Sequence, residues 1–281
     1  MIDAHQHLWQ LGNNDCEWPT ADLTSIYRDF EVKDLLPLTR ECGVTGTVLV
    51  QSQTSDADTD YLLRVADQSD LIKAVVGWVD LASPEAPERI ARLAVHPKFR
   101  GIRPMLQSLP DDAWILRAEL EPAIAAMKAH HLSLDALVYT RHLEHLYQFA
   151  RRHPALPIVI DHAAKPAIIV NDLPADEWCE AMRKIARLPQ VHCKLSGLVT
   201  EAGKGQGVEV FKAYIKFLVT LFGPERLMWG SDWPVIRLAP NPQLSIYKNW
   251  LDLVNHALVE QKITNFESVF IGTSLRFYRI T

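Results

Sequence analysis

The segment Ile2-Asp3-Ala4-His5-Gln6-His7 opens the chain as a short, apolar-led strand that ends in His-x-His. Side chains alternate between the two faces of a strand, so His5 and His7 point the same way and can contact one target together. A second strand-like segment, at residues 227–230, runs directly into Ser231-Asp232-Trp233-Pro234. Packing alone does not explain the histidine pair, and we expect the two distant segments to form the edges of one active site.

Between these ends the chain alternates short β-branched runs with segments of helical periodicity. Eight strands are predicted, at residues 2–5, 46–51, 72–80, 101–105, 132–138, 157–161, 191–195 and 227–230. A unit of strand plus helix that recurs about every 30 residues is typical of a (β/α)8 barrel. We therefore predict the α/β class, with a TIM barrel that forms a single domain over residues 1–281.

Composition narrows the class of protein further. The 281 residues are 48% hydrophobic and 22% charged, with a net charge of -5, as in ordinary soluble globular proteins. Charges of both signs are interspersed and no basic block occurs, so we expect no nucleic-acid partner. No apolar run reaches the roughly 18 residues of a membrane span, and we expect no membrane association. The oligomeric state stays open.

The cysteines predict a reducing compartment. Cys16, Cys42, Cys179 and Cys193 are irregularly spaced and form no Cys-x-x-Cys, so neither a zinc knuckle nor a disulfide framework is indicated. The first predicted strand begins at Ile2, which leaves no room before it for a secretory signal. We expect a cytoplasmic protein.

Candidate site residues follow from the predicted fold, because a barrel of this kind carries its chemistry at the C-terminal ends of its strands. His162 follows the sixth predicted strand, and Asp232 follows the eighth. The long loop at residues 9–29 is expected to fold over the mouth of the barrel. The polar and indole side chains expected to contact a substrate are Gln53, Trp78, Arg103, Lys194, Trp9, Gln51, Asp80 and Trp233.

Structural roles remain open for part of this set. His162 adjoins Asp161, which can simply be its partner. Arg103 and Lys194 lie in otherwise apolar strands, where an unpaired charge is costly, so each either faces a pocket or forms an internal salt bridge. Each tryptophan can equally belong to the core. The other eight histidines are interpreted as structural.

Three motifs in this order along the chain resemble the amidohydrolase superfamily. They are His-x-His at residues 5–7, Asp-His-x-x-Lys-Pro at 161–166 and Gly-Ser-Asp-Trp-Pro at 230–234. The chain is similar, more narrowly, to the amidohydrolase 2 branch of lactonases and related hydrolases, also in Trp18-Pro19, in Gly-Ile-Arg at 101–103 and in its last motif at 272–278. The resemblance implies that Asp232 deprotonates water. It also implies that His5, His7 and His162 bind a divalent metal or the substrate carbonyl.

The chain departs from the binuclear members of this superfamily. They carry a lysine or glutamate after strand 4 and a histidine after strand 5, where this chain has Arg103 and Leu137-Val138-Tyr139. His5, His7 and Asp232, with or without His162, still offer ligands for one zinc ion. The cation at Arg103 would repel a second metal. We favour catalysis without an obligatory metal or other cofactor, and a mononuclear zinc enzyme is the alternative.

The resemblance implies a small-molecule substrate, the lactone of a sugar acid, most nearly of the L-fucono- or L-rhamnono-lactone type. We hypothesise that Asp232 acts as general base on water while His5, His7 and His162 polarise the carbonyl. One alternative is a zinc-dependent amidohydrolase or decarboxylase of the same fold. Another is a barrel that binds sugar acids without catalysis. The sequence leaves the sugar, the ring size and the stereochemistry open.

Overall fold

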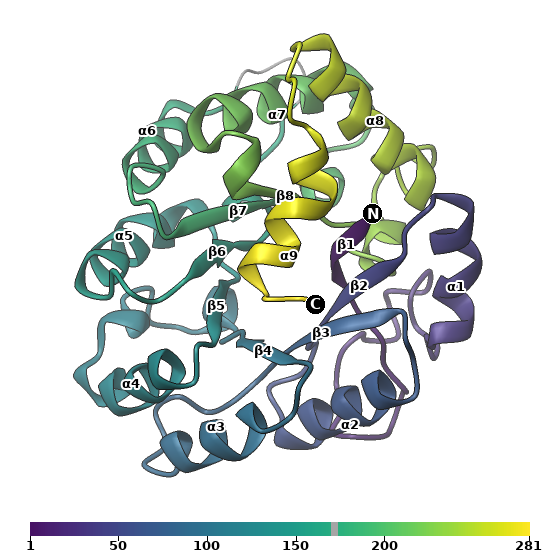
Figure 1. The fold of residues 1–281 in the computed structure, drawn as a ribbon. Coiled ribbons are helices and arrows are strands. Elements are labelled where there is room, and N and C mark those ends of the chain that lie inside the picture. Colours follow the sequence, from purple (N-terminus) through teal and green to yellow (C-terminus); the bar gives the residue numbers. More distant parts are fainter. Residues whose placement is uncertain (170–173) are drawn as a thin grey trace.

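Eight parallel strands follow one another in chain order around the molecule and are surrounded by helices (Figure 1). The computed structural model describes residues 1–169 and 174–281. The strands are β1 (Ile2–Gln6), β2 (Gly46–Val50), β3 (Ile72–Gly77), β4 (Phe99–Ile102), β5 (Ser133–Ala136), β6 (Ile158–Ile160), β7 (Val191–Leu195) and β8 (Leu227–Trp229). The α-helices are α1 (Val32–Glu41), α2 (Asp56–Asp67), α3 (Ala86–Ala94), α4 (Glu121–Ala129), α5 (Leu143–Arg152), α6 (Asp176–Ile185), α7 (Val208–Phe222), α8 (Tyr247–Glu260) and α9 (Thr273–Phe277).

This arrangement confirms the predicted TIM barrel, and each predicted strand overlaps an observed one. Six strands (β2, β3, β4, β5, β6 and β8) end one to three residues earlier than predicted, because the last residues of the runs leave the sheet. β3 ends at Gly77 and not at Asp80, and β4 ends at Ile102, so that Arg103 lies just beyond it. The register pairs Gly77 with Ile102 at this edge. The residues beyond both strands therefore belong to the loops above the barrel.

The first and last strands meet as the sequence predicted. The N–H of Asp232 donates to the carbonyl of His5 at 2.8 Å, and the N–H of His7 donates to the carbonyl of Trp233 at 2.8 Å. The buried Asp3 carboxylate accepts the N–H of Ser231 at 2.8 Å. These bonds close the barrel where β1 ends, so the His-x-His motif and Asp232 are brought together by backbone geometry.

Apolar residues cover both faces of the barrel sheet. One layer packs between the strands and the outer helices, and it includes Leu49, Val75 and Trp178. The smaller interior layer includes Val48 and Val50 of β2. This alternation explains why the five residues of β2, Gly-Thr-Val-Leu-Val, are all buried.

The C-terminal segment closes one end of the barrel. Helix α9 lies across the strands in Figure 1, and the chain ends beside their axis. Phe277 and Tyr278 belong to the interior apolar layer together with Val76 and Met228. The Tyr278 hydroxyl reaches inward and donates to the buried Asp135 at 2.6 Å. The end of the chain is thus part of the barrel interior.

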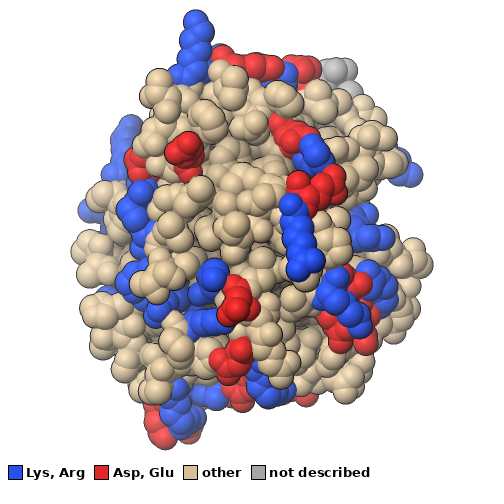
Figure 2. All heavy atoms as spheres, turned by 45° about the vertical axis from the view of Figure 1, so that its right-hand side comes forward, with Lys and Arg blue, Asp and Glu red and all other residues tan. Residues whose placement is uncertain are grey.

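The outer surface carries mixed charge. Lys and Arg side chains alternate with Asp and Glu over the face in Figure 2, and no extended patch of one sign occurs there. Among the helices of the described ranges, none has the length and apolarity needed to cross a membrane.

Candidate active site

Three predicted site residues converge at the closed seam between β1 and β8. His5 and His7 bring their Nε2 atoms to 3.1 Å from each other. Asp232 Oδ1 lies 3.3 Å from His7 Nε2 and 3.7 Å from His5 Nε2. All three side chains are buried. The i, i+2 spacing at the end of β1, with His7 one residue beyond the strand, therefore does what the sequence indicated, because it aims both imidazoles at one carboxylate.

His162 completes the group from the other side. Its Nε2 lies 3.9 Å from Asp232 Oδ1, and its ring packs edge-on against His5 with centroids 4.5 Å apart. Its Nδ1 lies 2.8 Å from the Ser196 hydroxyl. A Cβ on Gly197 would lie 2.4 Å from His162 Nδ1, so a glycine is required beside this ring.

The backbone that carries His162 is left-handed over four consecutive residues. The φ angles are 53° at His162, 50° at Ala163, 61° at Ala164 and 46° at Lys165. Left-handed backbone costs an L-residue roughly 1–2 kcal/mol, so the surrounding structure must hold this turn. The indole N–H of Trp178 donates to the Ala163 carbonyl at 2.8 Å, and the backbone N–H of Lys165 donates to the His162 carbonyl at 2.8 Å. The turn projects both His162 and Lys165 toward the barrel mouth.

A layer of buried charges lies beneath the histidines. The Lys194 ammonium contacts Asp135 at 2.6 Å, Asp161 at 2.9 Å and His5 Nδ1 at 3.1 Å. Arg103 Nη1 lies 3.3 Å from Asp161 and 3.5 Å from His5 Nε2. These cations neutralise the two carboxylates inside the barrel. They also place two permanent positive charges beside His5.

A backbone hydrogen bond assigns the proton on His7. The Val50 carbonyl lies 2.8 Å from His7 Nδ1, so this nitrogen carries the proton and His7 Nε2 keeps its lone pair. His5 lies between two groups that only donate, with Lys194 Nζ 3.1 Å from its Nδ1 and Arg103 Nη1 3.5 Å from its Nε2. The Nε2 atoms of His5 and His7 are 3.1 Å apart.

The environment keeps the histidines neutral and Asp232 ionised. Burial lowers the pKa of His162 to about 4 and lowers the pKa of His7. Burial, and then the Lys194 charge, hold the pKa of His5 well below its ordinary value. Burial by itself would raise the pKa of Asp232, but its imidazole neighbours, His162 foremost, outweigh burial and hold that pKa below the ordinary range. Asp232 is therefore available as a carboxylate at neutral pH.

A cavity of about 570 Å³ opens above this group at the C-terminal ends of the strands. His7, His162, Asp232 and Arg103 line its floor, whereas His5 is fully buried and is not among its lining residues. Its polar lining residues also include Glu17, Ser52, Gln53, Thr54, Gln107, Ser108, Lys165, Thr200 and Glu201. Its apolar lining residues are Trp18, Leu23, Met105, Leu137, Val235 and Leu238.

The eight predicted substrate-contacting residues separate into three groups. Arg103 and Gln53 line the cavity. Trp78 lines a neighbouring cavity of about 590 Å³, and Asp80 is exposed and caps its own loop through the Ala82 N–H at 3.1 Å. The other four are buried away from the cavity lining: Trp9, Gln51, Lys194 and Trp233.

Each of these four has a structural partner. The Trp9 indole N–H donates to the Arg28 carbonyl at 2.8 Å, and Trp233 packs edge-on against Phe30. The Gln51 amide donates to the Arg103 carbonyl at 2.8 Å. Lys194 forms the internal salt bridges that the sequence left open as its alternative role.

Sequence reasoning missed two groups of residues. Asp135 and Tyr278 complete the buried charge layer. Asp135 is a lone aspartate within a strand and gives no signal, and the motif at residues 272–278, which ends in Tyr278, does not indicate that its tyrosine reaches into the barrel. Lys165 and Glu201 line the cavity and lie 3.4 Å apart. Lys165 could have been found, because it belongs to the Asp-His-x-x-Lys-Pro segment.

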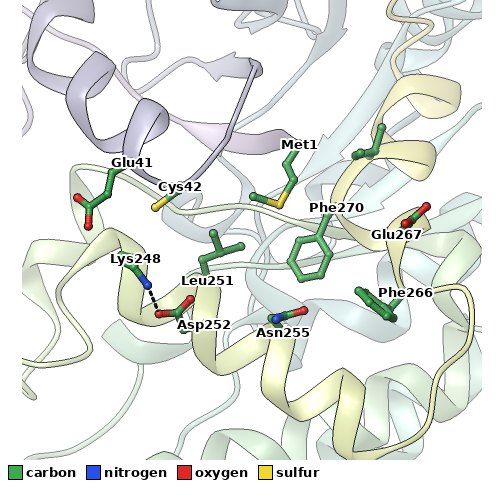
Figure 3. A pocket seen from close by; sticks show the side chains of 11 residues that line it. Met1, Glu41, Cys42, Lys248, Leu251, Asp252, Asn255, Phe266, Glu267 and Phe270 are labelled. Carbon is green, nitrogen blue, oxygen red and sulfur yellow. Dashed lines mark hydrogen bonds and ion pairs between the residues drawn. The ribbon is translucent and has the colours of Figure 1, made fainter.

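A second cavity, of about 510 Å³, lies apart from this site. It is formed where the end of α1 meets α8 and the segment before α9, as Figure 3 shows. Its walls combine Phe266 and Phe270 with a Lys248–Asp252 ion pair of 2.5 Å. None of the cavity's lining residues belongs to the histidine and aspartate group, so we assign the chemistry to the cavity above Asp232.

The donor atoms of the site fit a zinc ion. His5, His7 and Asp232 each offer one ligand atom, and these atoms lie within 4.8 Å of one another, as do those of His5, Asp161 and His162. Asp232 Oδ1 is buried and has no hydrogen-bond partner among the residues that the structure describes. Two imidazole nitrogens and a carboxylate are ordinary zinc ligands. The two cations beside His5 oppose this fit electrostatically.

Comparison with known proteins finds relatives and a solved structure that match most or all of the chain. An L-fucono-1,5-lactonase from Burkholderia ambifaria is 51% identical over 285 residues, which cover 99% of this chain and 95% of the relative. A second L-fucono-1,5-lactonase, from Burkholderia multivorans, is 36% identical over 262 residues, which cover 89% of this chain and 88% of that relative. The crystal structure of a Burkholderia multivorans amidohydrolase with bound zinc superposes with a TM-score of 0.91 at 34% identity, and the match covers 100% of this chain and 99% of that one.

A family model described as amidohydrolase matches residues 2–280, and with them all three motifs that surround Asp232. The match spans nearly the whole chain, and the two lactonases share more than a third of their aligned residues with it. The chain therefore belongs to the amidohydrolase 2 family.

Proposed function

We propose that this protein hydrolyses the lactone of a sugar acid, with L-fucono-1,5-lactone as its substrate. The observation that carries the proposal is the ionised Asp232 at the floor of a 570 Å³ cavity, held beside His7 and His162. The 51% identity to a protein named L-fucono-1,5-lactonase supports the choice of sugar. A cavity of this volume is in the range of small-molecule sites.

Hydrolysis begins with Asp232. Its carboxylate takes a proton from water, and the water oxygen attacks the lactone carbonyl carbon. His7 can share this proton, because its Nε2 lies 3.3 Å from Asp232 Oδ1. General base catalysis of this kind contributes roughly 100- to 10,000-fold.

Negative charge then develops on the carbonyl oxygen. Arg103 and His162 line the cavity and offer N–H donors to this oxygen, and His5 supports His7 from beneath. Each well-placed donor contributes about 3–4 kcal/mol. The bond between the carbonyl carbon and the ring oxygen breaks, and the ring oxygen takes the proton held by Asp232 and His7. The product is the open-chain hydroxy acid.

We propose that this reaction needs no obligatory metal. Arg103 already supplies a fixed cation beside the reacting carbonyl, and the Lys194 and Arg103 charges disfavour a further cation at His5. If zinc binds, His5, His7 and Asp232 would hold it, and it would supply Lewis-acid polarisation of the carbonyl.

The cavity wall suits a deoxy sugar. L-Fuconolactone carries a methyl group in addition to its ring hydroxyls. Leu137, Val235 and Leu238 give the cavity an apolar surface beside its polar one. Burial of a methyl group against such a surface contributes about 0.8 kcal/mol. This mixture supports a 6-deoxy aldonolactone as the ligand.

The direct test replaces Asp232 by asparagine, which keeps the shape of the side chain and removes the base. We expect the Asp232→Asn variant to hydrolyse L-fucono-1,5-lactone at least 100-fold more slowly, measured with a pH indicator. The matched control is Asp252→Asn, because Asp252 lies on α8 in an exposed ion pair away from the site. Wild-type activity in Asp232→Asn, or no turnover of any aldonolactone by the wild type, would contradict the proposal.

A further inference from the structure

Lys165 and Glu201 form a partly exposed ion pair on the wall of the catalytic cavity. Lys165 Nζ lies 3.4 Å from Glu201 Oε1, and the two side chains are 19% and 22% exposed. Both line the same cavity as Asp232. The contact is longer than the buried Lys194–Asp135 contact of 2.6 Å. Its charges are accessible to a ligand in the cavity.

Two loops hold the pair in place. Lys165 is the last residue of the left-handed turn after β6, and Glu201 follows the 3₁₀ turn Leu198–Thr200 after β7. The loops are joined where the Ile168 N–H donates to the Glu201 carbonyl at 3.4 Å and the Gly203 N–H returns a bond to Ile168 at 3.2 Å. The two loops, and with them the backbone positions of Lys165 and Glu201, are therefore joined to each other.

Hydrogen-bonding capacity remains on both groups. An ammonium has three N–H donors, and a carboxylate accepts about four bonds. Within residues 1–169 and 174–281, the contacts of the Lys165 ammonium are Glu201 and the Tyr139 ring, whose centroid lies 5.7 Å away. Burial raises the pKa of Glu201, as expected for a carboxyl group with few donors around it.

We propose that Lys165 and Glu201 bind the ring hydroxyls of the substrate and thereby select polyhydroxylated lactones over simple ones. The inference rests on the proposed lactonase function. The donor and the acceptor are separated by a distance similar to that between neighbouring hydroxyl oxygens on a ring, so Lys165 donates to one oxygen while Glu201 accepts from the other. A hydroxyl serves as both donor and acceptor, which suits this pairing.

The neighbouring reacting groups support this placement. The Lys165 charge contributes to the lowered pKa of His162, and the Asp232 charge contributes to the raised pKa of Glu201. The pair is thus close enough to sense the reacting groups, and no hydrogen bond or ion pair joins it to them among the described residues. A ring whose carbonyl lies over Asp232 would present its hydroxyls to this wall.

The test compares two substrates in each variant. L-Fucono-1,5-lactone carries the ring hydroxyls, whereas δ-valerolactone has the same six-membered ester without them. We measure the ratio of kcat/KM for the sugar lactone to kcat/KM for δ-valerolactone. A site built to bind a hydroxyl discriminates strongly against the analogue that lacks it, so the wild-type ratio should be large.

We expect Lys165→Met and Glu201→Gln each to lower this ratio tenfold or more, because the first removes a charged donor to a hydroxyl and the second replaces a charged acceptor by a weaker, neutral one. Glu201→Gln is nearly isosteric and serves as the second variant if Lys165→Met does not fold. Lys184→Met is the matched control, because its ion pair with Glu144 on the surface is remote from the cavity, and its ratio should equal that of the wild type.

A ratio that falls less than tenfold in both variants overturns the inference. This holds also where both rates fall together, since a merely structural role lowers them in parallel. A wild-type ratio near one overturns it as well, because no hydroxyl is then recognised. Failure of the wild type to hydrolyse either lactone is a different result, which refutes the lactonase function itself.

Discussion

Replacement of Lys194 by methionine tests whether the buried charge layer holds the site together. Lys194 is fully buried, and its ammonium is the shared partner of Asp135 at 2.6 Å and Asp161 at 2.9 Å. Methionine keeps much of the aliphatic volume and removes the charge. In the variant Asp161 retains Arg103 at 3.3 Å, whereas Asp135 retains the uncharged Tyr278 hydroxyl.

The expected loss of stability is large. Removal of one partner from a buried ion pair costs about 3–5 kcal/mol, because the other charge is left uncompensated in a low-dielectric interior. For a chain of this size each kcal/mol shifts Tm by about 2–4 °C, so Lys194→Met should unfold about 6–20 °C below the wild type. Thermal unfolding followed by circular dichroism measures the shift.

A double variant separates charge from packing. In Lys194→Met with Asp135→Asn the orphaned carboxylate is gone, and we expect at least half of the lost Tm to return. Lys184→Met, in a half-exposed pair with Glu144, should lower stability by less than about 1 kcal/mol. If Lys194→Met unfolds within 2 °C of the wild type, or if Asp135→Asn restores nothing, the electrostatic account of the layer is refuted.

Two further predictions concern protons and metal. Because burial lowers the pKa of His162 to about 4, the ring is neutral above that pH, and it gains a charge that pairs with Asp232 as the pH falls through 4. The acid limb of kcat/KM should therefore lie near pH 4, and a limb at the ordinary imidazole value of about 6.5 would contradict this environment. Lactonase activity should stay within twofold after exhaustive chelation, with zinc content followed by atomic emission; activity that is lost and then restored by zinc would make the histidines obligatory ligands.

The residues at the seam between β1 and β8 could be predicted because strand alternation and barrel closure determine where they lie. Alternation on β1 places His5 and His7 on one face, and parallel strands of a closed barrel bring their ends together. The structure confirms the fold, and it brings Asp232 and His162 to this point. These residues directly follow their strands, so an error of one or two residues in a strand boundary leaves them in place.

The side chains further from the seam could not be placed in this way. Lys194 lies within β7, where the pleat decides between cavity and interior, and its partner Asp135 comes from a strand two positions away. The sequence predicts Trp78 and Asp80 at the end of a strand, but β3 stops at Gly77, so both residues belong to a loop outside the lining of the catalytic cavity. Such outcomes depend on where sheet pairing stops, which a pattern of residue types does not specify.

Local conformational preference predicts the backbone least well at the active site itself. Asp232 has φ 57°, and His162 to Lys165 form four successive left-handed residues, none of them glycine. At roughly 1–2 kcal/mol each these conformations oppose the local preference of the chain, so tertiary contacts such as the Trp178 bond to Ala163 must select them. The turn carries both His162, the proposed hydrogen-bond donor to the substrate carbonyl, and Lys165, the proposed cation that binds a substrate hydroxyl. It holds the two residues in one rigid unit. A substrate that contacts Lys165 is thereby held at a fixed distance from His162, so binding at the hydroxyls and attack at the carbonyl are coupled through the same backbone.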